Sequence, residues 1–228
     1  MRKVLFIDYD DTLHDTNGKF TAEFHGIYGL SSDKILESYL HVHLNIVHPN
    51  HPEMHDDFFF HQKLLCDYLA VPYVEEEARS IARKFEEVHQ GRWLNPSFFP
   101  DTFPFLDIVH KESVLCLTTG DYAEEKAESL EKAAGKKYFR YAFDHTHLGI
   151  KGEDQYFINA LMSTNTLAHN AVVIGDSLEQ DISTGKKAGI TTIWLNRRQL
   201  AREHSSPTPD FEANDLFEVL RILRLLKK

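Results

Sequence analysis

The sequence predicts an α/β fold: a doubly wound parallel sheet that is interrupted by an inserted α-helical domain. Short apolar runs recur along the 228 residues and alternate with helix-like stretches. The first run, residues 4–7, is apolar at every position, as expected for a central strand that is covered on both faces. Between this run and the next lies a long segment, residues 16–95, without a comparable strand-like run. These three observations define the predicted architecture.

Four further strand-like runs follow the first, and helix-like stretches lie between them. The expected strands cover residues 4–7, 114–119, 141–143, 171–174 and 191–195. The expected helices cover residues 103–111, 123–134, 154–163, 181–188 and 215–226. Strands that alternate with helices in this way are typical of a parallel sheet with helices on both faces.

The long segment without strands is best explained as a helical domain inserted after the first strand. About eighty residues without a sheet element are too many for a loop in a compact domain. Prolines within the segment mark breaks between its helices. The chain is therefore predicted to divide into a core, residues 1–15 and 96–228, and a helical insertion, residues 16–95.

The composition is that of a soluble, acidic protein. The formal net charge is −10, and 42% of the residues are hydrophobic. An acidic chain is poorly suited to nucleic acid, because that affinity depends on lysine and arginine at phosphates. Cys66 and Cys116 form no paired motif, which favours a reducing, cytoplasmic location. The apolar start runs directly into Asp8, so neither a signal peptide nor a membrane span is expected there.

Asp8 and Asp10 follow the first apolar run and are the first candidates for a functional site. In open parallel sheets, ligands bind beyond the carboxyl ends of the strands, where Asp8 is expected to lie. The run Asp-Asp-Thr that follows allows the strand to stop and the chain to turn. Clustered carboxylates repel one another unless a cation or a shared proton relieves them. An acidic turn after a strand is the alternative interpretation.

Later strand ends supply further polar residues. Thr118 lies at the end of the second strand-like run, and Asp176 follows the fourth. Lys151 comes a few residues after the third run, and Asp181 lies on the first turn of the helix expected after Asp176. Together with the pair after the first strand, these residues offer a nucleophile, an acid/base group, a hydroxyl donor, a cation and a metal-binding carboxylate. Phosphoryl transfer needs this combination, because it depends on charge neutralisation and an in-line nucleophile.

Four segments resemble, in order, the four motifs of the haloacid dehalogenase (HAD) superfamily. Ile-Asp-Tyr-Asp-Asp-Thr-Leu, residues 7–13, is similar to the first motif, Asp-x-Asp-x-Thr-Leu. Leu-Thr-Thr-Gly, residues 117–120, resembles the second motif, and Lys151 resembles the lysine of the third. Gly-Asp-Ser-Leu-Glu-Gln-Asp, residues 175–181, resembles the fourth. Any one motif is weak evidence, whereas four in order are strong evidence.

The resemblance implies a Rossmann-like HAD core with an α-helical cap and an activity of the phosphatase type. It implies that Asp8 attacks phosphorus and becomes an aspartyl phosphate. Asp10 would protonate the leaving oxygen and then take a proton from the water that hydrolyses the intermediate. Mg²⁺ would be held by Asp8, the backbone carbonyl of Asp10, and Asp176.

The remaining motif residues are assigned by the resemblance to the substrate. Thr118 and Thr119 would bind the phosphoryl group, Thr118 by donating a hydrogen bond, and Lys151 would neutralise its charge. Asp181 would not contact the substrate directly; it would hold water or orient Lys151. Each residue has a simpler alternative. Thr118 can simply end a strand, Lys151 can be a solvated loop lysine, and Asp181 can complement a helix dipole.

The predicted function is Mg²⁺-dependent hydrolysis of the phosphate monoester of a small metabolite, without a nucleic-acid or membrane partner. A 2-haloacid dehalogenase is disfavoured, because halide leaves unprotonated and does not need Asp10. A phosphomutase would use the same core. A non-catalytic phosphate-binding module would be expected to lack Asp8 or Asp10. The sequence specifies neither the substrate nor the oligomeric state.

Histidines are concentrated in the predicted insertion. Six of the fourteen lie close together there: His41, His43, His48, His51, His55 and His61. The spacing of His51 and His55 would place both on one face of a helix, where they could bind a second metal. A packed or solvated histidine face is the more ordinary explanation of the same pattern.

Overall fold

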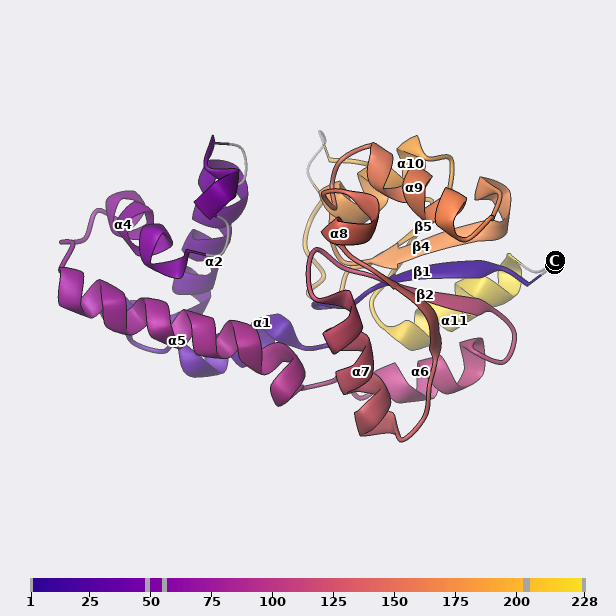
Figure 1. Cartoon of the computed structure of the whole chain (residues 1–228), viewed down its shortest axis with the longest axis horizontal. Coiled ribbons are helices and arrows are strands. Elements are labelled where there is room, and N and C mark those ends of the chain that lie inside the picture. The colour runs from indigo at the N-terminus through magenta and orange to yellow at the C-terminus, as the bar shows by residue number, and fades with distance from the viewer. Residues whose placement is uncertain (1, 48–49, 55–56, 203–205, 227–228) are drawn as a thin grey trace. The chain divides into compact units, whose positions relative to one another are not determined.

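The computed structural model describes residues 2–47, 50–54, 57–202 and 206–226 (Figure 1). The chain forms two compact units. One unit, the core, consists of residues 1–15 and 98–228, and the other, the insertion, consists of residues 16–97. The sequence places the return to the core two residues earlier, at residue 96. The long segment after the first strand is helical throughout its described residues, apart from turns and connections.

The core is built on one parallel sheet with the strand order β3-β2-β1-β4-β5-β6. Its strands are β1 (Val4–Asp8), β2 (Val114–Thr118), β3 (Phe139–Phe143), β4 (Ala171–Gly175), β5 (Thr191–Leu195) and β6 (Phe211–Ala213). The predicted α/β class is confirmed. The sequence misses β6, because three residues with an exposed glutamate at the centre carry no strand-like pattern. It also starts β3 too late, because exposed Arg140 interrupts the apolar run of this edge strand.

Helices cover both faces of this sheet (Figure 1). They are α6 (Thr102–Val109), α7 (Ala123–Ala134), α8 (His145–Leu148), α9 (Gln155–Ser163), η4 (Ala168–Asn170), η5 (Leu178–Ser183), α10 (Thr184–Lys187) and α11 (Leu216–Leu225). The prediction of a single helix over residues 181–188 is wrong, because two shorter helical elements cover this segment. A π-helical turn, η5, precedes a short α10, and Asp181 therefore lies inside the wider turn.

Alternate residues of β1 belong to two separate hydrophobic clusters. Leu5 and Ile7 pack in a cluster with residues of α6, α7 and α11. Val4 and Phe6 pack in a second cluster with residues of α8 and α9. All four side chains are at most 5% exposed. The uninterrupted apolar run at the start of the sequence is thus explained by burial on both faces.

The insertion has a hydrophobic core of its own. Its elements are α1 (Thr16–Glu23), η1 (Ile27–Gly29), α2 (Ser32–Val42), η2 (His43–Val47), η3 (Pro52–Met54), α4 (Phe58–Leu69) and α5 (Glu75–Leu94). Aromatic rings fill its centre: Phe24 lies 4.1 Å from Phe20 and 4.2 Å from Phe85, measured between ring centroids. Side chains cap two of its helices, since Ser31 accepts from Lys34 N and Asp57 from Phe60 N.

Two described histidines of the insertion, His43 and His61, pack against the ring of Tyr39, which itself contacts Phe20 and Phe85. His61 is fully buried, and its Nε2 lies 3.0 Å from Nδ1 of His43. Within the described part of the chain, no histidine belongs to a group of three potential metal ligands. His55, one member of the spaced pair, lies outside the described residues.

None of the described helices combines the length and the apolar character that crossing a membrane requires.

Arg197 ties together the loops around the carboxyl edge of the sheet. Its guanidinium donates to both carboxylate oxygens of Asp101, each at 3.0 Å, and to the carbonyl of Thr12 at 2.8 Å. It also lies over the ring of Phe99, 3.9 Å from the centroid. Asp101 in turn accepts from the backbone N of Leu216 at 2.8 Å. One bidentate pair therefore joins the segment after β5 to the loop after β1 and to the starts of α6 and α11.

Replacing Arg197 should therefore destabilise the core. We expect Arg197→Met to lower the free energy of unfolding by about 3 kcal/mol, because it leaves a buried carboxylate without its cation. The adjacent Arg198 is a matched control, since it is about half exposed and lies 3.8 Å from Asp11. Arg198→Met should change the free energy by less than about 0.5 kcal/mol. Chemical denaturation measures both free energies of unfolding. Equal effects of the two substitutions would contradict a stabilising role for the Arg197–Asp101 pair.

Candidate active site

Three neighbouring strands end at one edge of the sheet and bring their terminal residues together. Asp8, the last residue of β1, pairs in register with Thr118, the last residue of β2. On the other side of β1, Ile7 pairs with Ile174, and β4 ends at Gly175, directly before Asp176. Residues paired in register on parallel neighbours direct their side chains to the same face. Asp8 and Thr118 therefore lie in one site, and Asp176 joins them because one of its carboxylate oxygens lies within 4.8 Å of one from Asp8.

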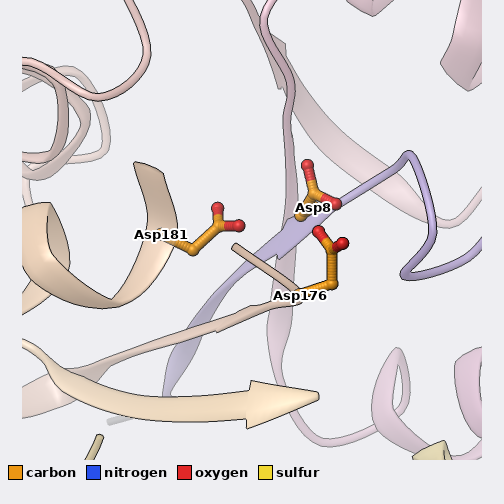
Figure 2. A group of neighbouring side chains, drawn as sticks. All are labelled: Asp8, Asp176 and Asp181. Atoms are coloured by element: carbon orange, nitrogen blue, oxygen red, sulfur yellow. The ribbon is translucent and has the colours of Figure 1, made fainter. Parts of the chain in front are cut away.

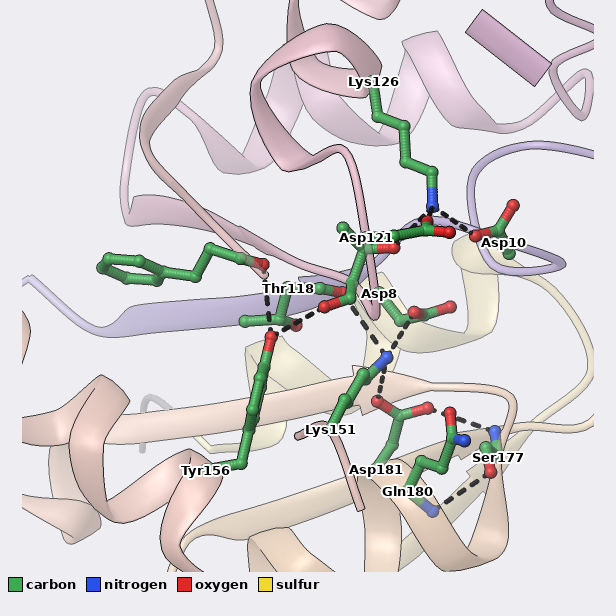
Figure 3. A network of polar contacts seen from close by, with 12 residues as sticks. Asp8, Asp10, Thr118, Asp121, Lys126, Lys151, Tyr156, Ser177, Gln180 and Asp181 are labelled. Atoms are coloured by element: carbon green, nitrogen blue, oxygen red, sulfur yellow. Dashed lines mark hydrogen bonds and ion pairs between the residues drawn. The ribbon is translucent and has the colours of Figure 1, made fainter. Parts of the chain in front are cut away.

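Lys151 lies between two carboxylates at this edge (Figure 3). Its Nζ is 2.5 Å from Oδ1 of Asp8 and 2.8 Å from Oδ1 of Asp181. It also donates to the carbonyl of Thr118 at 3.4 Å. The side chains of these three charged residues are at most 6% exposed. The residue that the sequence could also explain as a loop lysine is therefore a buried cation inside the site.

Burial and neighbouring charges together raise the pKa values of Asp8, Asp176 and Lys151. Burial raises the pKa of Asp8 to about 7, against the influence of Lys151, and Asp181 adds to the increase. Burial, together with Asp8, raises the pKa of Asp176 well above its usual value. Burial alone would lower the pKa of Lys151, but Asp181 and Asp8 raise it well above the ordinary value. In their ionised forms, Asp8, Asp176 and Asp181 would carry three negative charges against the one positive charge of Lys151, an excess that a further cation would relieve.

Asp8, Asp176 and Asp181 form a group of carboxylates that fits a metal ion (Figure 2). One oxygen from each lies within 4.8 Å of the others. Oδ2 of Asp8 is buried and has no hydrogen-bond partner among the described residues. Oxygen ligands of this kind suit Mg²⁺ and other hard divalent cations. The resemblance assigns Asp181 a supporting role outside the metal ligands. In the structure, its carboxylate belongs to the same group as those of Asp8 and Asp176 and also contacts Lys151.

The local fold around β4 holds Asp181 in this position. Oδ2 of Asp181 accepts from the backbone N of Ser177 at 3.2 Å. The Ser177 hydroxyl accepts from Gln180 N at 3.1 Å and caps the start of η5. Gly175 makes the approach possible, because a Cβ at that position would overlap the Asp181 carboxylate. The motif glycine is therefore required by packing against an acidic side chain.

Asp10 lies beyond the end of β1 and contacts a second buried lysine, Lys126. The Nζ of Lys126 is 2.8 Å from Oδ2 of Asp10 and 2.5 Å from Oδ1 of Asp121. It also donates to Oγ1 of Thr119 at 2.8 Å. The hydroxyl that the sequence assigns to substrate thus accepts a hydrogen bond from a lysine. Thr118, by contrast, has a buried Oγ1 that has no hydrogen-bond partner among the described residues.

Lys126 is the site residue that the sequence motifs miss. It lies on α7, whose buried positions are Ala123, Lys126, Ala127 and Leu130. Three of these four residues are apolar, and their spacing is that of one helix face. A lysine within an apolar helical stripe is the signal that could have identified it.

A model of the haloacid dehalogenase-like hydrolase family matches residues 4–195. The chain belongs to this family. It is therefore an enzyme of the hydrolase class, and the predicted membership of the HAD superfamily is confirmed.

Two relatives with curated functions are phosphatases. The chain is 24% identical over 159 residues to the glyceraldehyde 3-phosphate phosphatase of Methanopyrus kandleri, with 68% of each chain covered. It is 26% identical over 146 residues to the phosphoserine phosphatase of Thermus thermophilus, covering 63% of this chain and 57% of that protein. The alignments thus span between about half and two thirds of the relatives' lengths.

Solved structures of similar fold include hydrolases and dehalogenases. The HAD-hydrolase YfnB of Bacillus subtilis, determined bound to magnesium, superposes with a TM-score of 0.72 at 18% identity, covering 97% of this chain and 98% of that chain. The 2-haloacid dehalogenase of Pseudomonas syringae superposes with a TM-score of 0.62 at 25% identity, covering 99% of each chain. The first likeness concerns the fold alone.

The carboxylate group predicts that a divalent cation stabilises the protein. Saturating Mg²⁺ should raise the melting temperature of protein stripped with a chelator. At a hundred times the dissociation constant, the stabilisation would be about 2.7 kcal/mol. Asp176→Asn removes one ligand charge and relieves repulsion within the group. The metal-free variant should therefore be at least as stable as the metal-free wild type, and it should gain little from Mg²⁺.

Differential scanning fluorimetry measures both effects. Asp154→Asn is the matched control, because Asp154 is exposed and pairs with exposed Lys187. It should respond to Mg²⁺ as the wild type does. A wild-type melting temperature that Mg²⁺ leaves unchanged, or an equal response of Asp176→Asn, would contradict the metal site.

Proposed function

We propose that this enzyme is a Mg²⁺-dependent phosphatase that hydrolyses the phosphate monoester of a small metabolite through an aspartyl phosphate on Asp8. One observation carries the proposal. Two buried polar atoms, Oδ2 of Asp8 and Oγ1 of Thr118, lie on paired strand ends without a hydrogen-bond partner among the described residues. One is suited to attack phosphorus, and the other to donate a hydrogen bond to a phosphoryl oxygen.

The similar proteins support the same reaction class. The relatives from Methanopyrus kandleri and Thermus thermophilus are both named as phosphatases. The net charge of −10 favours a small phosphorylated substrate over nucleic acid. Both cysteines, Cys66 and Cys116, are free and buried, in keeping with a cytoplasmic enzyme.

The first chemical step transfers the phosphoryl group to Asp8. An Asp8 oxygen forms a bond to phosphorus while the bond from phosphorus to the ester oxygen breaks. Asp10 gives its proton to that departing oxygen, so the product leaves as an alcohol. Lys151 and Thr118 stabilise the charge on the phosphoryl oxygens.

The second step regenerates the enzyme. Asp10, now a carboxylate, takes a proton from water as the water oxygen attacks phosphorus. The bond between phosphorus and Asp8 breaks, and inorganic phosphate leaves. The second step thus returns to Asp10 the proton that it gave up in the first, and it frees the Asp8 carboxylate.

The metal would be held by carboxylates already gathered at the strand ends. Asp8 and Asp176 are the proposed ligands, with the backbone carbonyl of Asp10, and Asp181 lies within reach of the same position. When bound, Mg²⁺ would supply positive charge that offsets the carboxylates and the phosphate.

Asp10 distinguishes the phosphatase from a dehalogenase on the same fold. A halide needs no proton to leave, whereas an alkoxide does. In this chain Asp10 is present and its carboxylate is held by Lys126 at 2.8 Å. The presence of Asp10 favours ester hydrolysis over dehalogenation.

Substitution of the nucleophile tests the proposal. With Mg²⁺, purified wild type should release inorganic phosphate from members of a broad panel of phosphate monoesters. Asp8→Asn should lower kcat by at least about 10³-fold, because the amide cannot form the acyl phosphate. Asp154→Asn, an exposed carboxylate replaced in the same way, should retain full activity.

Two results would overturn the assignment. One is a folded wild type that releases no phosphate from any ester of the panel. The other is release of halide from a 2-haloacid by an enzyme without phosphatase activity, which would replace the phosphatase by a dehalogenase.

A further inference from the structure

The ammonium group of Lys126 has as many close acceptors as it has protons to donate. Its Nζ donates to Oδ2 of Asp10, Oγ1 of Thr119 and Oδ1 of Asp121, at 2.8, 2.8 and 2.5 Å. The lysine side chain is fully buried. An ammonium carries three donors, so this geometry uses all of them and leaves the group a single orientation.

The surroundings of Lys126 make a purely structural role costly. It occupies the buried stripe of α7, where an apolar side chain would pack without desolvating a charge. It also lies only three residues after Ala123, the first residue of the helix, where the helix dipole disfavours a cation. Burial and the helix dipole therefore both disfavour a positive charge at this position. The ion pairs of Lys126 with Asp10 and Asp121 are what stabilises this charge.

One of these carboxylates belongs to the reaction. Asp10 lies beyond the end of β1, and the next residue, Asp11, has a left-handed backbone with φ of 55°. The strand ends at Asp8, two residues before Asp10, so the sheet does not fix the direction of the Asp10 side chain. Lys126 reaches this carboxylate from another element, α7 (Figure 3).

We propose that Lys126 is a positioning residue that holds the Asp10 carboxyl group at the oxygen of the leaving group. The inference rests on the proposed phosphatase function and adds a residue that its motifs do not include. Lys126 would not touch the substrate. It would act by holding Asp10 in one orientation, while Thr119 and Asp121 hold the ammonium itself.

This role predicts a dependence on the leaving group. An alkyl phosphate needs a proton on its departing oxygen, whereas p-nitrophenyl phosphate releases a stable anion and needs little help. Lys126→Met should therefore lower kcat by roughly 10–100-fold for an alkyl phosphate that the enzyme accepts. It should lower kcat for p-nitrophenyl phosphate by less than about fivefold, with KM of both substrates little changed.

The matched comparisons use the same two substrates. Asp10→Asn should show the same selective loss, and adding Lys126→Met to it should cost less than about a further twofold, because both act through one group. Lys132→Met is the control for charge removal on α7, since Lys132 is exposed in its last turn. It should keep the wild-type ratio of the two kcat values. Lys126→Gln, which retains a donor and places no apolar group beside the carboxylates, serves if Lys126→Met does not fold.

The outcomes separate this inference from the proposed function. A selective loss on the alkyl ester, absent in Lys132→Met, supports the positioning role. A folded Lys126 variant that loses activity equally on both esters, or that keeps the wild-type ratio, overturns it and leaves the phosphatase intact. A wild type without activity on either ester overturns the proposed function itself.

Discussion

A buried ammonium group, that of Lys151, is the interaction on which the site depends. It holds Asp8 and Asp181 at 2.5 and 2.8 Å, in surroundings where neither carboxylate has appreciable access to solvent. Without this cation, the end of β1 would carry uncompensated negative charge in the interior, a state that costs several kcal/mol. The parallel register of β1, β2 and β4 then determines which other groups meet the pair. Charge balance at three strand ends is thus the organising constraint of the core.

Two lysines divide the carboxylates of the site into two groups. Lys151 faces Asp8 and Asp181, the residues proposed for the nucleophile and the metal side of the site. Lys126 faces Asp10 and Asp121, on the side proposed for the leaving group. Asp8 and Asp10, only two residues apart, are thereby held in different electrostatic surroundings. This separation gives a physical basis for assigning them different tasks.

The sequence predicts the parts of this arrangement that depend on local pattern. Asp8, Thr118 and Asp176 each end or follow an apolar run, and parallel strands bring such ends to one edge. The position of Lys126 could not be predicted in this way, because its contact with Asp10 joins residues 116 apart in sequence. The sequence pattern also does not predict the short strand β6 or the π-helical turn η5, since both depend on packing against the sheet rather than on a periodic pattern. Asp181 consequently lies in one group of carboxylates with Asp8 and Asp176.

Trapping the covalent intermediate tests the account most directly. Wild-type enzyme would be mixed with Mg²⁺ and a substrate carrying labelled phosphate, quenched in acid during turnover, and digested for peptide mapping. The account predicts acid-stable label that hydroxylamine removes, as expected of an acyl phosphate, on the peptide that contains Asp8. Turnover with no trapped label, or label on a peptide that lacks Asp8, would contradict it.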